Sequence, residues 1–323
     1  MSHHGAPLFF ATLGIASLVA GVAVGAQPYK APRTSWGDPA IQGVYTNNTN
    51  VPYERPVELG TKDIYTAEEY EERRNARAVV ELTTAVTDVH YQTSDFGLDP
   101  EQSEMVTNPR TSVLSQPANG RMPPLRADAK QRSDAARAAQ LAHAYDSAQA
   151  RPLQERCLIW SHEGPPFRPV GYNTLVQIAQ SRGYVVLMTE MVHDARVIPI
   201  AKAPPDFGGL KRWQGNSWGH WEADTLVIET TGFSDKVNPR GSNVPMGPEG
   251  KVIEKITPTG PLSVRYAFTV SDPSLWDASW GGEFPMETVD GPVFEYACHE
   301  GNYGLPNTLR GVREEEGSRS SKP

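Results

Sequence analysis

The sequence predicts a mainly β protein built on an antiparallel meander. Short apolar, β-branched segments recur from residue 174 onward, with turn signals and no helical pattern between them. The 28 Gly and 28 Pro residues also favour many turns and short elements. Such a meander closes as a lipocalin-like barrel, which we expect, or folds as a β-sandwich, because residue patterns do not separate the two.

The expected strands follow in chain order from a first short strand at residues 41–45. Turn signals at residues 258–261 and at Asp290-Gly291 join the last four strands as two hairpins. The other expected strands cover residues 110–116, 174–180, 184–190, 195–200, 218–222, 225–230, 252–257, 262–270, 283–288 and 293–297.

Two helices are expected before the meander. Thr66 and Glu69 form a capping box that opens a charged helix over residues 67–82, and an Ala-rich stretch predicts a solvent-facing helix over 126–150. We therefore expect three parts in the mature chain. These are a wrapping segment at 27–160, a barrel core at 161–313 and a disordered tail at 314–323.

The first 26 residues have the features of a signal peptide. Residues 8–24 are apolar and uncharged, and Val24-Gly25-Ala26 fits the small-x-small cleavage rule before Gln27. The segment before them has no Lys or Arg, so an uncleaved membrane anchor is the alternative. We expect a periplasmic or secreted protein with no membrane association after cleavage.

The charge of the chain limits its partners. A net charge of -8 and a pI of about 5.5 argue against nucleic acid, which requires a clustered basic face. We expect a small-molecule substrate or ligand instead. The composition says nothing about the oligomeric state.

Cys157 and Cys298 are the only cysteines. An oxidising compartment favours a disulfide between them, which would tie the middle of the chain to its C-terminal part. Two separate buried thiols are the alternative.

The first polar cluster runs from residue 190 to residue 196. Strand alternation would place Glu190, Asp194 and Arg196 on one face and His193 on the other, unless a turn interrupts the strand. A carboxylate beside His and Arg can orient a general base or bind a substrate anion. We expect His193 and Asp194 to be catalytic and Glu190 and Arg196 to bind substrate. A structural ion pair with a solvent-facing His is the alternative.

The second cluster lies on the strand that ends at Glu222. Trp218, His220 and Glu222 share one face, which would suit a pocket wall that binds a ring and moves a proton. We expect His220 and Glu222 to be catalytic, and Trp213 and Trp218 to contact substrate. If this face points outward, the three residues form only a polar ladder.

The third cluster surrounds Cys298. Glu295 and His299 would share one face, with Glu300 on the other, and all three are candidate substrate-binding residues. A structural role beside the disulfide explains Cys298 and Tyr296 without them.

A metal site is the alternative for the three histidines of these clusters. His193, His220 and His299 with neighbouring carboxylates could bind zinc or iron, but no HxH or HExxH pair occurs and the residues lie on separate segments. We therefore expect no cofactor. The sequence also has no G-x-S-x-G elbow, P-loop or G-x-G-x-x-G motif.

A set of motifs extends over nearly all of the mature chain: Glu54-Arg55-Pro56, Asn119-Gly120-Arg121-Met122-Pro123-Pro124-Leu125, Glu155-Arg156-Cys157, His193-Asp194-Ala195-Arg196, Gly219-His220-Trp221-Glu222 with Asp224-Thr225-Leu226, and the run from Glu295 to Tyr303. As a set they resemble a family of exported bacterial proteins labelled hypothetical. The resemblance implies export in a bacterium with a Gram-negative type of envelope, and it implies no reaction. Where the family often has Gly-His-Trp-Glu-Gly-Asp, Ala223 replaces the second Gly.

These patterns predict an exported enzyme that uses His and carboxylate acid–base catalysis on a small apolar or aromatic molecule. Lyase, hydratase or isomerase chemistry fits, with His193 or His220 as base, Asp194 and Glu222 as partners and Arg196 as anion clamp. A non-catalytic protein that binds a hydrophobic ligand is one alternative, and a metal-dependent hydrolase is another. An envelope-associated structural protein with no pocket is a further class.

Overall fold

The structure is a computed structural model that describes residues 29–49, 51–83, 106–160, 162–170, 173–234, 246–247 and 249–320. The expected signal peptide lies outside these residues. No helix in the described part is long and apolar enough to cross a bilayer.

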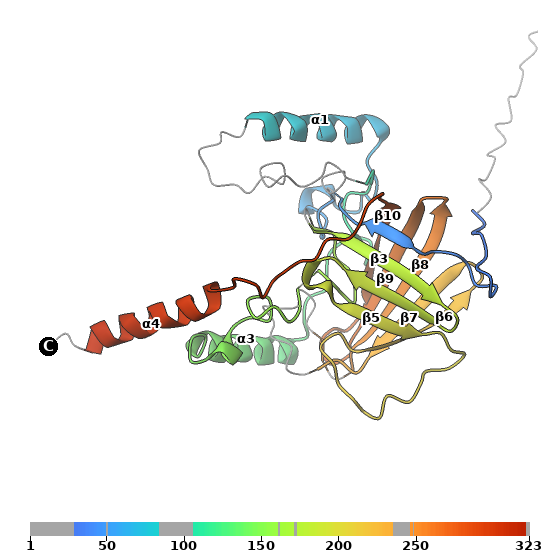
Figure 1. The fold of residues 1–323 in the computed structure, drawn as a ribbon. Helices are drawn as coiled ribbons and strands as arrows, with labels where there is room; N and C mark the ends of the chain where they lie inside the picture. Colours follow the sequence, from blue (N-terminus) through green and yellow to red (C-terminus); the bar gives the residue numbers. More distant parts are fainter. Residues whose placement is uncertain are drawn as a thin grey trace, which may run out of the picture.

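Ten strands form one sheet (Figure 1). In sheet order the main path is β5-β4-β3-β1-β10-β9-β8-β7-β6, and β2 pairs with β10 beside this path. The strands are β1 (Gly43–Thr46), β2 (Leu114–Gln116), β3 (Leu175–Ser181), β4 (Tyr184–Thr189), β5 (Ala195–Pro199), β6 (Asn216–Glu222), β7 (Thr225–Thr231), β8 (Lys251–Gly260), β9 (Ser263–Ser271) and β10 (Trp280–Thr288).

The sheet curls into a nearly closed barrel. Every ladder within it is antiparallel. Because the main path contains an odd number of alternating strands, its two end strands, β5 and β6, run in the same direction. They meet at a single isolated parallel bridge between Ile200 and Gly219. The barrel therefore has one unsealed seam, between β5 and β6.

The prediction of a mainly β, barrel-like fold is confirmed, and the strands form one continuous sheet. The expected hairpin partner at residues 293–297 is wrong, because these residues form no strand. The reason is that β10 has no free edge there: Glu287 pairs with β1 on one side and with β9 on the other. The expected strand at 110–116 is reduced to β2.

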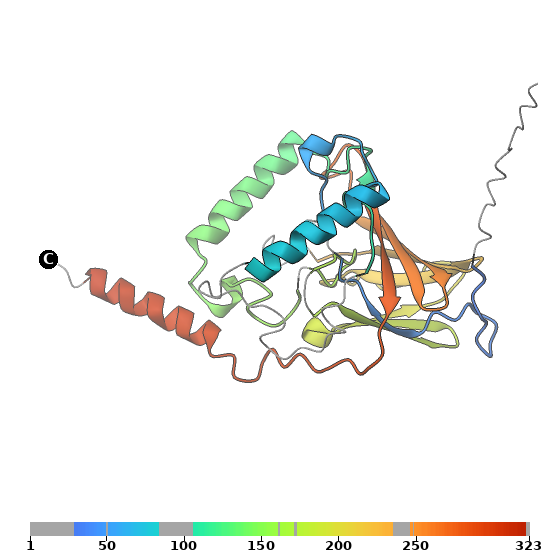
Figure 2. The same cartoon turned by 90° about the horizontal axis from the view of Figure 1, so that it is seen from above.

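The described residues contain three α-helices, which lie to one side of the barrel (Figures 1 and 2). The capping box forms at α1 (Ala67–Thr83), where the Glu69 amide donates to Thr66 Oγ1 at 3.3 Å and the Thr66 amide donates to Glu69 Oε2 at 2.8 Å. The second helix, α3 (Ala127–Ala142), is shorter than expected and is followed by the 3-10 turn η3 (Ala148–Ala150). Another 3-10 turn, η1 (Val57–Leu59), precedes α1.

The third helix, α4 (Gly304–Ser320), corrects the expectation of a disordered tail beginning at residue 314. It extends away from the barrel (Figure 2). Arg313 holds it to the segment that follows α3, because its guanidinium donates to the Tyr145 carbonyl at 2.7 Å. Within α4, Arg313 also pairs with Glu316 at 3.1 Å.

The sulfurs of Cys157 and Cys298 lie at disulfide distance, as predicted. The bond fastens the segment that follows β10 to the loop that precedes β3. It therefore places the third polar cluster beside residues 153–160, away from the strands.

The barrel interior is filled mainly by apolar side chains, but it also holds a buried ion pair. Inward-facing aromatic residues include Tyr266, Phe268 and Phe284, all with less than 5% exposure. Between them Glu254, which is fully buried, accepts two hydrogen bonds from the Arg196 guanidinium at 2.7 and 2.8 Å. This pair links β5 to β8 across the interior.

We expect Arg196→Met to lower the free energy of unfolding by about 3–5 kcal/mol, because it leaves the Glu254 carboxylate buried without its partner. Chemical denaturation of the purified protein measures the loss. The double variant Arg196→Met, Glu254→Leu should recover most of it, since both charges are removed.

The exposed pair of Lys255 and Glu222 supplies the control for this experiment. Its loss in Lys255→Met should lower the free energy of unfolding far less than Arg196→Met does, as for surface ion pairs in general. If Lys255→Met and Arg196→Met lowered the free energy of unfolding equally, the buried pair would contribute no more to stability than the exposed pair, against our expectation.

Candidate functional site

The seam between β5 and β6 opens on both sides of its single bridge. There the Ala201 amide donates to the Gly219 carbonyl at 2.9 Å. A Cβ at position 219 would lie only 3.1 Å from Ile200 Cδ1 and 3.3 Å from Ile198 Cγ2, so the missing side chain allows the two strands to approach. On each side of this contact the strands diverge and leave a cavity.

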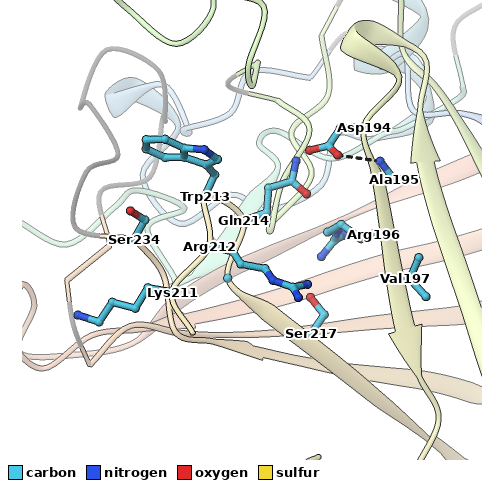
Figure 3. A pocket seen from close by; sticks show the side chains of 11 residues that line it. Asp194, Ala195, Arg196, Val197, Lys211, Arg212, Trp213, Gln214, Ser217 and Ser234 are labelled. Carbon is cyan, nitrogen blue, oxygen red and sulfur yellow. Dashed lines mark hydrogen bonds between the residues drawn. The ribbon is translucent and has the colours of Figure 1, made fainter. Parts of the chain in front are cut away.

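The larger cavity, which we call the main cavity, has a volume of about 720 Å³. It lies between β5, the start of β6 and the loop that leads into β6 (Figure 3). Its charged lining residues are Asp194, Arg196, Lys211 and Arg212, and its aromatic and polar ones are Trp213, Gln214, Ser217 and Ser234.

The loop that carries Lys211 to Gln214 is fixed by backbone hydrogen bonds. The Arg212 amide donates to the Gly232 carbonyl at 3.1 Å, and the Ser234 amide donates to the Arg212 carbonyl at 2.8 Å. Gly215 ends the loop at φ +70°, where a Cβ would lie 2.7 Å from Thr230 Cγ2. These contacts give the cavity a defined wall opposite β5.

Arg196 lines the main cavity with its charge already balanced. Both of its terminal nitrogens donate to Glu254, and the Tyr266 hydroxyl donates to the same carboxylate at 2.7 Å. The guanidinium also lies 4.9 Å from the centre of the Phe167 ring. The role of anion clamp expected for Arg196 therefore suits Arg212 better, since no ion pair is formed by Arg212 among the residues that the structure describes.

A 3-10 turn, η4 (Met191–His193), separates β4 from β5 and interrupts the alternation expected for the first cluster. Val192 and His193 have φ values of 60° and 39°, in the region that non-glycine residues seldom occupy. As a result His193 is exposed and outside the cavity lining, whereas Asp194 reaches the cavity wall. Glu190 is buried behind the turn, where it accepts hydrogen bonds from Asn173 and the Leu175 amide.

A second carboxyl group, Glu163, lies behind Asp194. Its side chain is only 1% exposed, and it accepts a hydrogen bond from the Trp160 amide at 2.8 Å. The Thr189 hydroxyl lies 3.4 Å from both Glu163 Oε1 and the Asp194 carbonyl, so it connects the two residues. Burial raises the pKa of Glu163 to about 8, and the negative charge of Asp194 adds to the rise.

Neither Glu163 nor its neighbour His162 was identified from the sequence. His162 is also buried, and burial, assisted by the Arg168 charge, lowers its pKa to about 4. The adjacent His-Glu pair before Gly164-Pro165-Pro166 was the available signal, because titratable residues in a rigid Pro-Gly segment are unusual in plain core. Lys211 and Arg212 were not identified either, because two neighbouring cations in a polar loop usually indicate a solvent-exposed surface.

Trp218 and His220 of the second cluster line a smaller cavity of about 450 Å³ on the other side of the bridge. Trp218, His220 and Glu222 share one face of β6, as predicted, and that face is the outer one. Trp218 and His220 stack at 5.4 Å, and His220 lies 3.5 Å from Glu222, which also pairs with Lys255. The structure thus separates His220 and Glu222 from the main cavity, while Trp213 lines it.

The third cluster lies apart from both cavities of the seam. Glu295, His299 and Glu300 are exposed on the segment that follows β10. Glu300 lines a cavity of about 500 Å³ beside the disulfide, together with Trp160 and Tyr296.

The three histidines considered for a metal lie on η4, on β6 and on the segment after β10. Within the described ranges no group of three or more His, Cys, Asp or Glu side chains is placed to hold a metal ion.

Fold and geometry define a barrel-like β protein with a charged cavity at its seam. Comparison of the chain with protein-family models, with curated proteins and with solved structures finds no match.

Glu163 should make the stability of the protein depend on pH. Its folded-state pKa of about 8 lies above the ordinary value of 4.5, so the folded state keeps a proton that the unfolded chain has lost. The free energy of unfolding should therefore fall as the pH rises through 8. Relative to Glu163→Gln, we expect the wild type to lose about 1 kcal/mol between about pH 7 and pH 9.

Denaturant titrations of both proteins at several pH values test this expectation. The control is Glu295→Gln, because Glu295 is exposed on the segment after β10. Its pH dependence should match that of the wild type. A Glu163→Gln variant with the same dependence as the wild type would show that Glu163 is ionised in the folded protein.

Proposed function

We propose that this protein is an acid–base enzyme that binds a small molecule in the main cavity. The observation that carries the proposal is the pairing of two carboxyl groups in different environments. Asp194 lies at the cavity wall, and Glu163 lies behind it in a buried position that favours its protonated form. In such a pair the carboxyl group at the cavity can act as a base, while the buried one supports it without meeting the substrate.

In this proposal Asp194 is the catalytic base. The Ala195 amide donates to its Oδ1 at 2.9 Å, which orients the carboxylate beside the cavity. Glu163 does not line the cavity and is a positioning residue: through Thr189 it supports the turn that carries Asp194. Trp213 supplies an aromatic surface for the substrate.

A carboxylate base beside an aromatic surface suits a lyase, hydratase or isomerase, in which a proton is removed from carbon and a proton is returned. It requires neither a covalent nucleophile nor a nucleotide. Compared with the expectation from the sequence, the base moves from histidine to Asp194, because none of the described histidines lines the main cavity.

A non-catalytic ligand-binding protein is the second candidate. The observation that favours it is the same lack of a described histidine in the lining, since a carboxylate alone can serve only to bind. The two candidates differ in what happens when Asp194 loses its charge.

We expect Asp194→Asn to lower kcat by about 10²- to 10⁴-fold while the protein still binds substrate, because the amide cannot accept a proton. The substrate would first be found by screening small aromatic and apolar compounds for turnover. The control is Asp206→Asn, because the Asp206 side chain lies in an exposed loop outside the main cavity, where it accepts a hydrogen bond from the Gly208 amide. Unchanged kcat in Asp194→Asn would contradict the role of Asp194, and binding without turnover of any compound would favour the second candidate.

A further inference from the structure

The charges around the main cavity do not cancel. Among the residues that the structure describes, Arg196, Lys211 and Arg212 supply positive charge to its lining and Asp194 supplies negative charge. Glu254 compensates Arg196 from inside the barrel. Among the described lining residues, Lys211 and Arg212 therefore outnumber Asp194, on a chain whose net charge is -8.

Arg212 is the cation best placed to meet a ligand. Its guanidinium is directed across the cavity toward β5, near Ser217 and Arg196, whereas the Lys211 side chain extends to the other side of the loop (Figure 3). Its backbone is held by hydrogen bonds with Gly232 and Ser234, so the base of the side chain has a fixed position. A planar guanidinium in such a position recognises a carboxylate with two parallel hydrogen bonds.

The rest of the lining indicates what the anion is attached to. Trp213 contributes an indole to the lining, from the side of the loop that also carries the Lys211 side chain (Figure 3), and Val197 adds an apolar side chain that is 59% exposed. Asp194, Gln214 and the Arg212 guanidinium all lie on the side of the loop that faces β5 (Figure 3). A ligand with its anion at Arg212 would thus place its apolar body between the cation and the proposed base.

We propose that the main cavity binds an aromatic monocarboxylate, with the carboxylate on Arg212 and the ring between Arg212 and Asp194. This inference rests on the proposed function and names the substrate class of the same site. A monoanion matches the small excess of positive charge better than a phosphate dianion. Asp194 would remove a proton from a carbon atom outside the ring and the carboxylate group of the substrate. It would then return the proton to another carbon atom, which completes an isomerisation.

The test is calorimetric titration of the full mature chain with 2-naphthoate, its neutral isostere 2-naphthamide and inorganic phosphate. We expect 2-naphthoate to bind at least about tenfold more tightly than 2-naphthamide, since one charged pair separates them. Arg212→Gln should weaken 2-naphthoate binding by a similar factor and leave 2-naphthamide unchanged. Lys211→Gln is the matched control, because it removes the same charge from the next residue of the loop. Its effect should stay within about threefold.

The Asp194→Asn variant separates this inference from the proposed function. Removing a like charge from the cavity should tighten 2-naphthoate binding, in contrast to the loss of turnover expected for the same variant. Tighter binding without turnover of any compound would therefore support the ligand class and contradict the enzyme.

Several results would overturn the inference. These are equal affinity for acid and amide, no binding of either, stronger binding of phosphate than of 2-naphthoate, or equal losses in the Arg212 and Lys211 variants. Thermal unfolding of each variant shows whether the fold is kept. If Arg212→Gln does not fold, Arg212→Lys replaces it and should retain the preference for the acid with weaker affinity.

Discussion

The parallel relation of β5 and β6 is the constraint on which the rest of the structure depends. An antiparallel path with an odd number of strands cannot close without one parallel pair, and here the pair falls between strands that are consecutive in the chain. A tight hairpin cannot join parallel strands, so the chain must travel back along the barrel before β6 begins. That return path contains Lys211 to Gln214. The same constraint thus opens the seam and supplies the residues that line it.

The buried pair of Arg196 and Glu254 is the counterpart of this open seam. An end strand that lacks a full ladder on one side is held less firmly than an interior strand. Arg196 projects from β5 into the barrel, and its hydrogen bonds to Glu254 anchor that strand to β8 from within. Tyr266 adds a third hydrogen bond to the carboxylate and receives one from the Phe167 amide. Residues at the cavity are therefore positioned by polar contacts in the core.

Most of the barrel could be predicted from the sequence, because an alternation of apolar and polar residues indicates a strand with one buried face. The ranges of β3, β4, β5 and β7 agree with expectation to within a residue or so. The false strand at 293–297 has the right residues, but no edge of the sheet was left for it. Such competition for edges is a property of the whole sheet and is not visible in a local pattern.

The candidate site was recovered only in part, for a similar reason. Asp194, Arg196 and Trp213 were expected and line one cavity, whereas His220 and Glu222 lie on the outer face of β6. The left-handed turn at Val192 and His193 changed which side chains point inward, and nothing in those two residue types indicates it. Glu163 becomes a candidate only once its burial is known, since a glutamate in a sequence does not reveal its surroundings.

The position of the disulfide has a mechanical consequence. Cys157 precedes β3 and Cys298 follows β10, so the covalent bridge encloses all the strands between them in one loop. Tension applied between the two ends of the chain would pass through the sulfur–sulfur bond and bypass those strands. Only the segments before Cys157, with β1 and β2, and the segment with α4 would carry the load. A force applied to the two termini would therefore leave most of the barrel, and with it the seam, out of its path.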